Sequence, residues 1–90
     1  MVSQILTVVE GGNITLTCNA SGVPYPLIRW TRIGQSTVLS QNSSLTVANV
    51  RRPGNSNNLI QYQCTASNGV ESPATAIANV TVYCKYFGKL

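Results

Sequence analysis

The chain has 90 residues, which is enough for one domain and too few for two. Only 9% of its residues are charged, and the net charge of +4 reflects scarce acids more than clustered bases. We therefore expect solvated loop charges and no nucleic-acid partner, with a contact to a glycosaminoglycan or another acidic surface as the alternative. No run approaches the ~20 apolar residues of a membrane helix, so membrane contact is expected only through other parts of a longer protein.

The predicted elements are strands throughout, because β-branched residues are abundant and apolar and polar residues alternate with period two in the strands after the first. In chain order the strands are predicted over residues 3–9, 14–18, 27–31, 44–49, 60–66 and 74–82. Asn68-Gly69, between the last two, is a strong hairpin signal. About seven short strands, turn signals every eight to twelve residues and no helical period predict an all-β antiparallel sandwich.

Three cysteines, Cys18, Cys64 and Cys84, allow three pairings, each of which leaves one thiol over. Alternation points Cys18 and Cys64 inward on separate strands, so they can face each other across the core, and we predict this disulfide. Its loop of about 47 residues corresponds to roughly 4 kcal/mol of stabilisation. Trp30 has the same inward parity. For Cys84, a partner elsewhere in a longer protein, an interchain bridge and a free thiol all stay open.

The acceptor pattern for N-linked glycosylation, Asn-x-Ser/Thr, occurs four times. Its asparagines are Asn13, Asn19, Asn42 and Asn79. Four such sites, together with a predicted disulfide, indicate an oxidising compartment. We therefore expect an extracellular protein, either secreted or the ectodomain of a cell-surface membrane protein.

Four segments, residues 10–18, 22–30, 45–50 and 62–68, resemble the immunoglobulin superfamily. The last segment, and the Gly-Val-Pro-Tyr-Pro motif before Trp30, look like I-set and C2-set domains of adhesion molecules and cell-surface receptors. The resemblance implies an immunoglobulin-like sandwich over residues 1–83, with 84–90 as a linker or the start of the next segment. It also implies that Tyr62 is a tyrosine-corner residue, whose hydroxyl bonds to upstream backbone.

The chain departs from the family pattern in two connections. Only fourteen residues separate Trp30 from Leu45, which is too short for two further strands of normal length. We expect one short strand near residues 37–39, in a C2-type arrangement. The connection over residues 51–58 is long and lacks the usual aspartate, so we expect it to be mobile.

The resemblance implies that the strands at 3–9, 14–18 and 44–49 share one sheet, whose outer side would carry the glycans of Asn13 and Asn19. The other sheet would contain the C, F and G strands of the family. We name its outward residues the C–F–G face: Arg29, Thr31, Gln61, Gln63, Thr65, Thr75 and Ile77. This surface is polar and almost uncharged, and arginine is favoured at interfaces. Asn79 is also outward, but is expected near the strand end, at the fringe of the face.

These features predict an extracellular module of a receptor or adhesion molecule that recognises protein ectodomains, homophilic or heterophilic, through the C–F–G face. The alternative is a structural spacer domain that binds little. The chain has no histidine and two carboxylates, so general acid–base, nucleophilic and zinc chemistry lack their usual residues. We expect no enzyme activity, no catalytic or metal-binding residues, and no cofactor.

Overall fold

The computed structural model describes residues 4–51, 58–70 and 72–83. Within these residues it is an all-β structure of seven strands and no helix, so no helix long and apolar enough to cross a membrane occurs there. The strands are β1 (Gln4–Val9), β2 (Ile14–Thr17), β3 (Leu27–Arg32), β4 (Val38–Ser40), β5 (Ser44–Val47), β6 (Leu59–Ser67) and β7 (Ala74–Tyr83).

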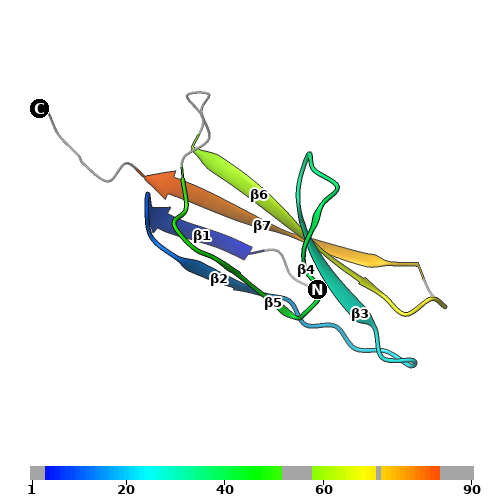
Figure 1. The fold of residues 1–90 in the computed structure, drawn as a ribbon. Coiled ribbons are helices and arrows are strands. Elements are labelled where there is room, and N and C mark those ends of the chain that lie inside the picture. The colour runs from blue at the N-terminus through cyan, green and yellow to red at the C-terminus, as the bar shows by residue number, and fades with distance from the viewer. Residues whose placement is uncertain (1–3, 52–57, 71, 84–90) are drawn as a thin grey trace, which may run out of the picture.

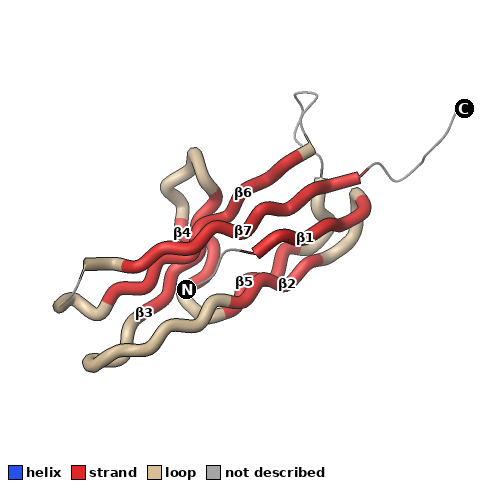
Figure 2. The backbone as a smooth tube through the Cα atoms, turned by 180° about the vertical axis from the view of Figure 1, so that it is seen from behind, coloured by secondary structure: helices blue, strands red, loops and turns tan. Residues whose placement is uncertain are grey.

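The strands form two sheets that face each other (Figure 1). The larger sheet has five strands in the order β1-β7-β6-β3-β4, and the smaller sheet pairs β2 with β5. Neighbours are antiparallel except β1 and β7, which run parallel. Figure 2 shows β1, β7 and β6 side by side in the larger sheet, with β2 and β5 in the other layer.

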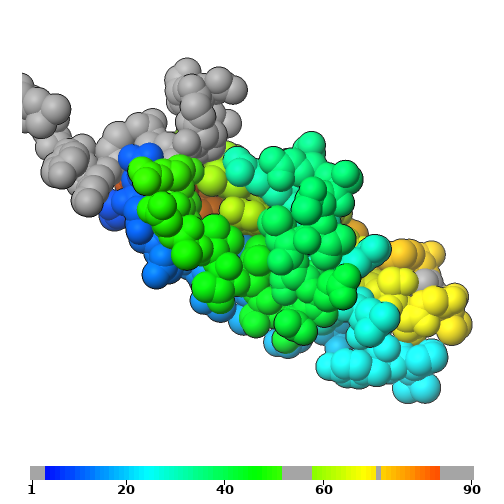
Figure 3. All heavy atoms as spheres, in the orientation of Figure 1, coloured from blue at the N-terminus to red at the C-terminus, as the bar shows by residue number. Residues whose placement is uncertain are grey.

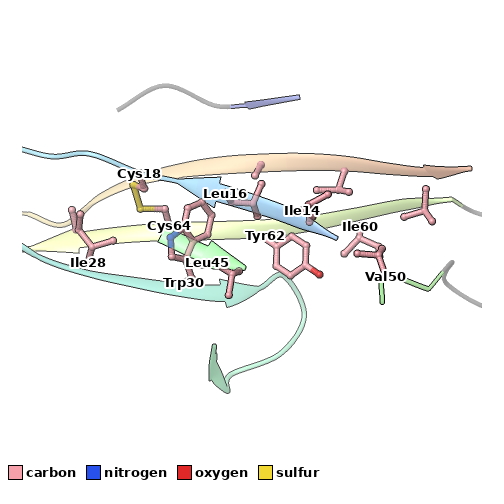
Figure 4. Packing of buried hydrophobic residues seen from close by; sticks show 14 residues of the cluster. Ile14, Leu16, Cys18, Ile28, Trp30, Leu45, Val50, Ile60, Tyr62 and Cys64 are labelled. Carbon is pink, nitrogen blue, oxygen red and sulfur yellow. A yellow bond between two sulfur atoms is a disulfide. The ribbon is translucent and has the colours of Figure 1, made fainter. Parts of the chain in front are cut away.

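The core follows from the alternation of apolar and polar residues in the sequence. In β2 and β6, every second residue is buried between the sheets and the residues between them face outward. Figure 4 shows the core running from Ile28 at one end, past Trp30 and Tyr62, to Ile60 and Val50 at the other. Leu6 and Val8 of β1 pack against it from the edge.

The predicted disulfide between Cys18 and Cys64 is present and joins the end of β2 to β6, with the two Cα atoms 6.5 Å apart. Trp30 pairs with Cys64 on the neighbouring strand, so its ring lies beside the disulfide (Figure 4). Trp30 is 2% exposed, and its indole Nε1 donates to the Ser43 carbonyl oxygen at 3.5 Å. The disulfide and the indole therefore tie the two sheets together at one level of the core.

The assignment of the first strand to the smaller sheet was wrong. β1 pairs in parallel with β7 over its whole length, from Gln4 opposite Ala78 to Val9 opposite Tyr83. This register places Leu6 and Val8 beside the buried valines of β7, where their side chains reach the core. The larger sheet therefore gains a fifth strand, and β7 becomes an interior strand.

The turn after β1 carries the chain from the larger sheet to the smaller one. The Glu10 amide donates to the Tyr83 carbonyl oxygen at 2.8 Å, which ends the pairing with β7. The Gly11 amide donates to the Val50 carbonyl oxygen at 2.7 Å, and the Val50 amide donates to the Gly12 carbonyl oxygen at 2.9 Å. The crossing is thus hydrogen-bonded to both layers.

Gly11 has a φ of +90°, which residues with a Cβ rarely adopt. We expect Gly11→Ala to lower the free energy of unfolding by about 1–2 kcal/mol, because alanine is strained in this region. Urea denaturation of the two proteins measures the change. Gly22→Ala is the matched control, since Gly22 has no positive φ and an added Cβ would meet its nearest atoms at 3.5 Å. Equal losses in the two variants would contradict the strain argument.

The short strand expected near residues 37–39 is β4, which pairs with β3 through Thr31 opposite Val38. Asn68 and Gly69 do connect β6 to β7, but through the six residues 68–73 and not a two-residue hairpin. The tail at 84–90 with Cys84, and most of the 51–58 connection, lie outside the described residues. The hydroxyl bond of a tyrosine corner would fall on that upstream connection, so this role of Tyr62 stays a prediction.

Tyr62 provides a pH-dependent contribution to stability. Desolvation by burial raises the pKa of its hydroxyl above 10.0, and the nearby charge of Arg32 lowers it by less. Because the folded-state pKa is raised, the contribution is complete below the unfolded-state pKa and is lost as pH rises through the folded-state value. We expect the wild-type domain to lose more stability above pH 10 than Tyr62→Phe does. Parallel denaturation curves for both proteins between pH 8 and pH 11 test this, and identical slopes would contradict it.

Candidate functional site

The C–F–G face is the outer side of β3, β6 and β7, and cross-strand pairing arranges its residues in rows. One row contains Arg29, Thr65 and Thr75, which face one another across the three strands. The next row pairs Thr31 with Gln63, and Gln63 with Ile77. All members have the opposite parity to the buried residues of the same strands.

The seven residues placed on this face from the sequence alone therefore share one surface in the structure. Arg29 and Thr75 are exposed, and the other five are half-buried between their strand neighbours. Arg29 is the only charged side chain among the seven. Such a surface can donate and accept hydrogen bonds with little cost of desolvating charge.

β1 enlarges the face, and this part was missed from the sequence. Its outward residues Ile5, Thr7 and Val9 lie beside Asn79, Thr81 and Tyr83 of β7. Ile5 is 80% exposed. The sequence of β1 does not alternate, because Ile5-Leu6 and Val8-Val9 are adjacent apolar pairs, so only its pairing with β7 decides which residues face outward and on which sheet.

An open groove lies at the end of the face that is nearest to the loops before β3 and after β6. Tyr25 and Leu27, each 77% exposed, line it together with Arg29. The other wall includes Ser67 and Asn68, and the Asn68 side-chain amide donates to the Pro24 carbonyl oxygen at 3.3 Å. An aromatic ring, an aliphatic side chain and a guanidinium group are therefore exposed together. Tyrosine and arginine are enriched at binding hot spots.

The smaller sheet presents a different surface (Figure 3), in which β5 and its flanking segments are drawn in green and β2 in blue. Its outward side chains are polar, and the Thr15 and Thr46 hydroxyls lie 3.3 Å apart across β2 and β5. Asn13 and Asn19 are both exposed at the two ends of β2. That glycans at these positions cover the outer side of this sheet stays a prediction.

Asn79 was expected at the fringe of the C–F–G face, and the structure corrects this. Asn79 lies in the middle of β7, with Gln61 of β6 on one side and Ile5 of β1 on the other. The Gln61 Nε2 donates to the Asn79 Oδ1 at 2.8 Å. Asn79 is the sixth of the ten residues of β7, and β1 pairs along the other edge of this strand, so Asn79 is central both along the strand and across the sheet.

Within the described residues, no group of three or more histidine, cysteine, aspartate or glutamate side chains is arranged to hold a metal ion. The two buried cysteines are joined in the disulfide, and Glu10 lies in the turn between the sheets. The candidate site is the broad C–F–G face, whose outward side chains are chiefly polar and uncharged.

Two observations decide the family: the two-layer sandwich with its disulfide and tryptophan, and the match of the immunoglobulin domain profile to residues 2–68. The chain is an immunoglobulin domain. Its sequence is 36% identical over 86 residues to MAM domain-containing glycosylphosphatidylinositol anchor protein 2 of mouse and of human. That alignment covers 89% of the chain but only 9% of either relative, so the domain corresponds to a small part of a much longer protein.

Solved structures with similar folds include proteins that contain two successive immunoglobulin domains. The complex of the first immunoglobulin domain of Dpr11 with DIP-gamma contains a chain that superposes with a TM-score of 0.75 and 30% identity, over 90% of this chain and 43% of that one. The N-terminal two-domain module of the Drosophila receptor protein tyrosine phosphatase DLAR gives 0.68 and 34%, over 90% and 45% respectively. This immunoglobulin domain is thus homologous to modules of cell-surface receptors and adhesion proteins, among which are domains that bind protein partners.

Proposed function

We propose that this immunoglobulin domain is an extracellular module of a cell-surface protein and recognises protein ectodomains through the C–F–G face. Support for an ectodomain partner comes from the Dpr11 and DIP-gamma complex, in which one immunoglobulin protein is bound to another. Support for the compartment comes from the disulfide, which persists in oxidising surroundings, and from the glycosylphosphatidylinositol-anchored relative.

The observation that carries the proposal is the composition of the face at its groove end. Arg29, Tyr25 and Leu27 are exposed together there, next to a broad row of threonine and glutamine side chains. A partner can bury the ring and the aliphatic chain in its own pockets while the polar row forms the hydrogen bonds of the rim. The smaller sheet offers no comparable set among its described residues, since its exposed side chains are chiefly threonine and serine.

The proposal is a binding role without catalysis. The whole chain has no histidine and two carboxylates, so no residue pair of the usual kind is available for general acid–base work. We infer that any activity of the longer protein in which this domain occurs resides in its other parts.

The test is a binding screen of the domain, produced in animal cells and displayed as a multimer, against a collection of cell-surface ectodomains and against itself. For any partner found, the binding affinity is then measured with a double variant of the domain that carries both Arg29→Glu and Gln63→Arg. We expect the double variant to lose at least about 30-fold in affinity, the range of a hot-spot substitution of 2 kcal/mol or more.

The matched control is Thr46→Glu, which adds a charge at an exposed position of β5 on the smaller sheet. Its affinity should equal that of the wild type. A partner that tolerates the double variant but not the control binds through the smaller sheet, and the proposed face is then wrong. A domain that binds no ectodomain and does not self-associate would favour the spacer role.

A further inference from the structure

The glycosylation acceptor pattern at Asn79 occupies an unusual place for such a motif. Asn79 and Thr81 both point out from the C–F–G face, while Val80 between them is 0% exposed in the core. β6 and β1 pair with both edges of this stretch of β7. By contrast, the three residues of the pattern that begins at Asn42 are all exposed, in the bend between β4 and β5 and at the start of β5.

The orientation of the Asn79 amide suits a glycan. Its Oδ1 accepts the hydrogen bond from Gln61 Nε2 at 2.8 Å, which turns the oxygen toward β6. No hydrogen bond between described residues uses the Asn79 Nδ2, the atom to which a glycan is attached. A sugar on Nδ2 therefore leaves the contact with Gln61 in place.

We propose that Asn79 is an N-linked glycosylation site inside the binding surface, so that its glycan and a partner docked on the C–F–G face exclude each other. The second half of this statement rests on the proposed function. A protein interface of standard size buries about 800 Å² on each partner and is packed as closely as a protein interior at its centre. An oligosaccharide rising from the middle of the face is bulky and hydrated, and prevents that close packing.

The transfer itself is a substitution at the anomeric carbon of a lipid-linked oligosaccharide pyrophosphate. The Asn79 Nδ2 forms an N-glycosidic bond to the N-acetylglucosamine that carries the pyrophosphate, and gives up one proton to the solvent. The bond from that carbon to the pyrophosphate oxygen breaks, and the lipid pyrophosphate leaves with the electron pair. No oxidant or reductant takes part.

The structure also determines when this reaction can happen. A transferase must reach the asparagine amide and the Thr81 hydroxyl together, and in the folded domain the backbone between them is paired on both edges with Val80 buried. Asn79 is therefore accessible only before β7 joins the sheet, whereas Asn42 stays accessible after folding. Competition between glycan transfer and folding then sets the fraction of molecules that carry the Asn79 glycan and therefore have a blocked C–F–G face.

The first experiment compares the folded, oxidised domain made without glycans with the same chain reduced and unfolded. Both are incubated with oligosaccharyltransferase and the lipid-linked donor, and glycopeptides are identified by mass spectrometry. We expect Asn42 to be modified in both samples and Asn79 only in the unfolded chain, with glycopeptides of Asn79 also present in protein from animal cells. Modification of Asn79 in the folded domain, or its absence from the cellular protein, would overturn the inference and leave the proposed function standing.

The second experiment uses a nanobody as the probe of the face, selected against the unglycosylated domain and mapped to Gln63 and Thr65 by loss of binding to variants. We expect domain carrying the Asn79 glycan to bind it at least 100-fold more weakly than unglycosylated domain. Thr81→Val, which removes the acceptor pattern while keeping Asn79 and the branched shape, should restore binding in protein from animal cells. Ser44→Ala, which removes the pattern at Asn42, should not.

Equal nanobody affinity with and without the Asn79 glycan would refute the exclusion. Because the nanobody is independent of any natural partner, a failed ectodomain screen leaves this result interpretable. A successful screen combined with equal nanobody affinity would support the proposed function and refute the exclusion by the Asn79 glycan.

Discussion

Reduction of the Cys18–Cys64 disulfide is expected to lower the free energy of unfolding by about 4 kcal/mol. The bridge joins residues 46 apart in sequence and ties the smaller sheet to β6 of the larger one. Opening it releases the unfolded chain from a long closed loop, which increases its conformational entropy. A domain of 90 residues has a total stability of about 5–13 kcal/mol. The reduced domain should therefore be close to its unfolding threshold at 37 °C.

Urea denaturation of the oxidised and phosphine-reduced domain, followed by far-UV circular dichroism, measures this loss. Cys84→Ser serves as the background for both samples, because a third thiol could exchange with the bridge during unfolding. The double variant Cys18→Ala with Cys64→Ala checks that the loss belongs to the bridge and not to the reductant. A decrease below 1 kcal/mol would show that the two sheets are held by packing alone.

Trp30→Ala is expected to lower the free energy of unfolding by about 3–5 kcal/mol, the usual range for a buried tryptophan. Trp30 is 2% exposed and lies between the disulfide and Tyr62 in the middle of the core (Figure 4). Alanine leaves a large void there and also removes the indole donor to the Ser43 carbonyl oxygen. Chemical denaturation followed by circular dichroism is the measurement, since Trp30 is the only tryptophan and its fluorescence is lost in the variant.

Trp30→Phe separates packing from hydrogen bonding, because it retains an aromatic ring without the donor. We expect it to lose less than half as much stability as Trp30→Ala. When Trp30→Ala is combined with reduction of the disulfide, the decrease in the free energy of unfolding should differ from the sum of the two separate decreases, because Trp30 and Cys64 are cross-strand neighbours. An additive result, or a loss near zero for Trp30→Ala, would contradict the central position of this side chain in the core.

The sequence by itself determined which side is buried in β2, β3, β6 and β7. Side chains alternate between the two faces of a strand, so one residue that is known to face inward determines the orientation of every other residue in that strand. Cys18 and Cys64 gave this for β2 and β6, and the disulfide between them followed. The outward set on β3, β6 and β7 then came from the same parity, and the structure places its seven members on one surface.

Pairing between distant segments is a different kind of information, and only the tertiary structure decided it. The sequence of β1 has no regular alternation, because Ile5-Leu6 and Val8-Val9 are adjacent apolar pairs, and it is compatible with either sheet. The hydrogen bonds to β7, and a turn at Gly11 that bonds to Val50 of the opposite layer, select the larger sheet. These contacts join residues more than thirty positions apart, which a local pattern does not encode.

That one pairing accounts for most of what was missed at the candidate site. It adds Ile5 and its neighbours to the C–F–G face, and it moves Asn79 from an outer position to the middle of a sheet. The exposed groove at Tyr25 and Leu27 likewise depends on how the loops before β3 and after β6 meet in space. The sequence thus determined which residues of β2, β3, β6 and β7 face outward, whereas the neighbours of these residues across the surface depend on the order of the strands within the sheet.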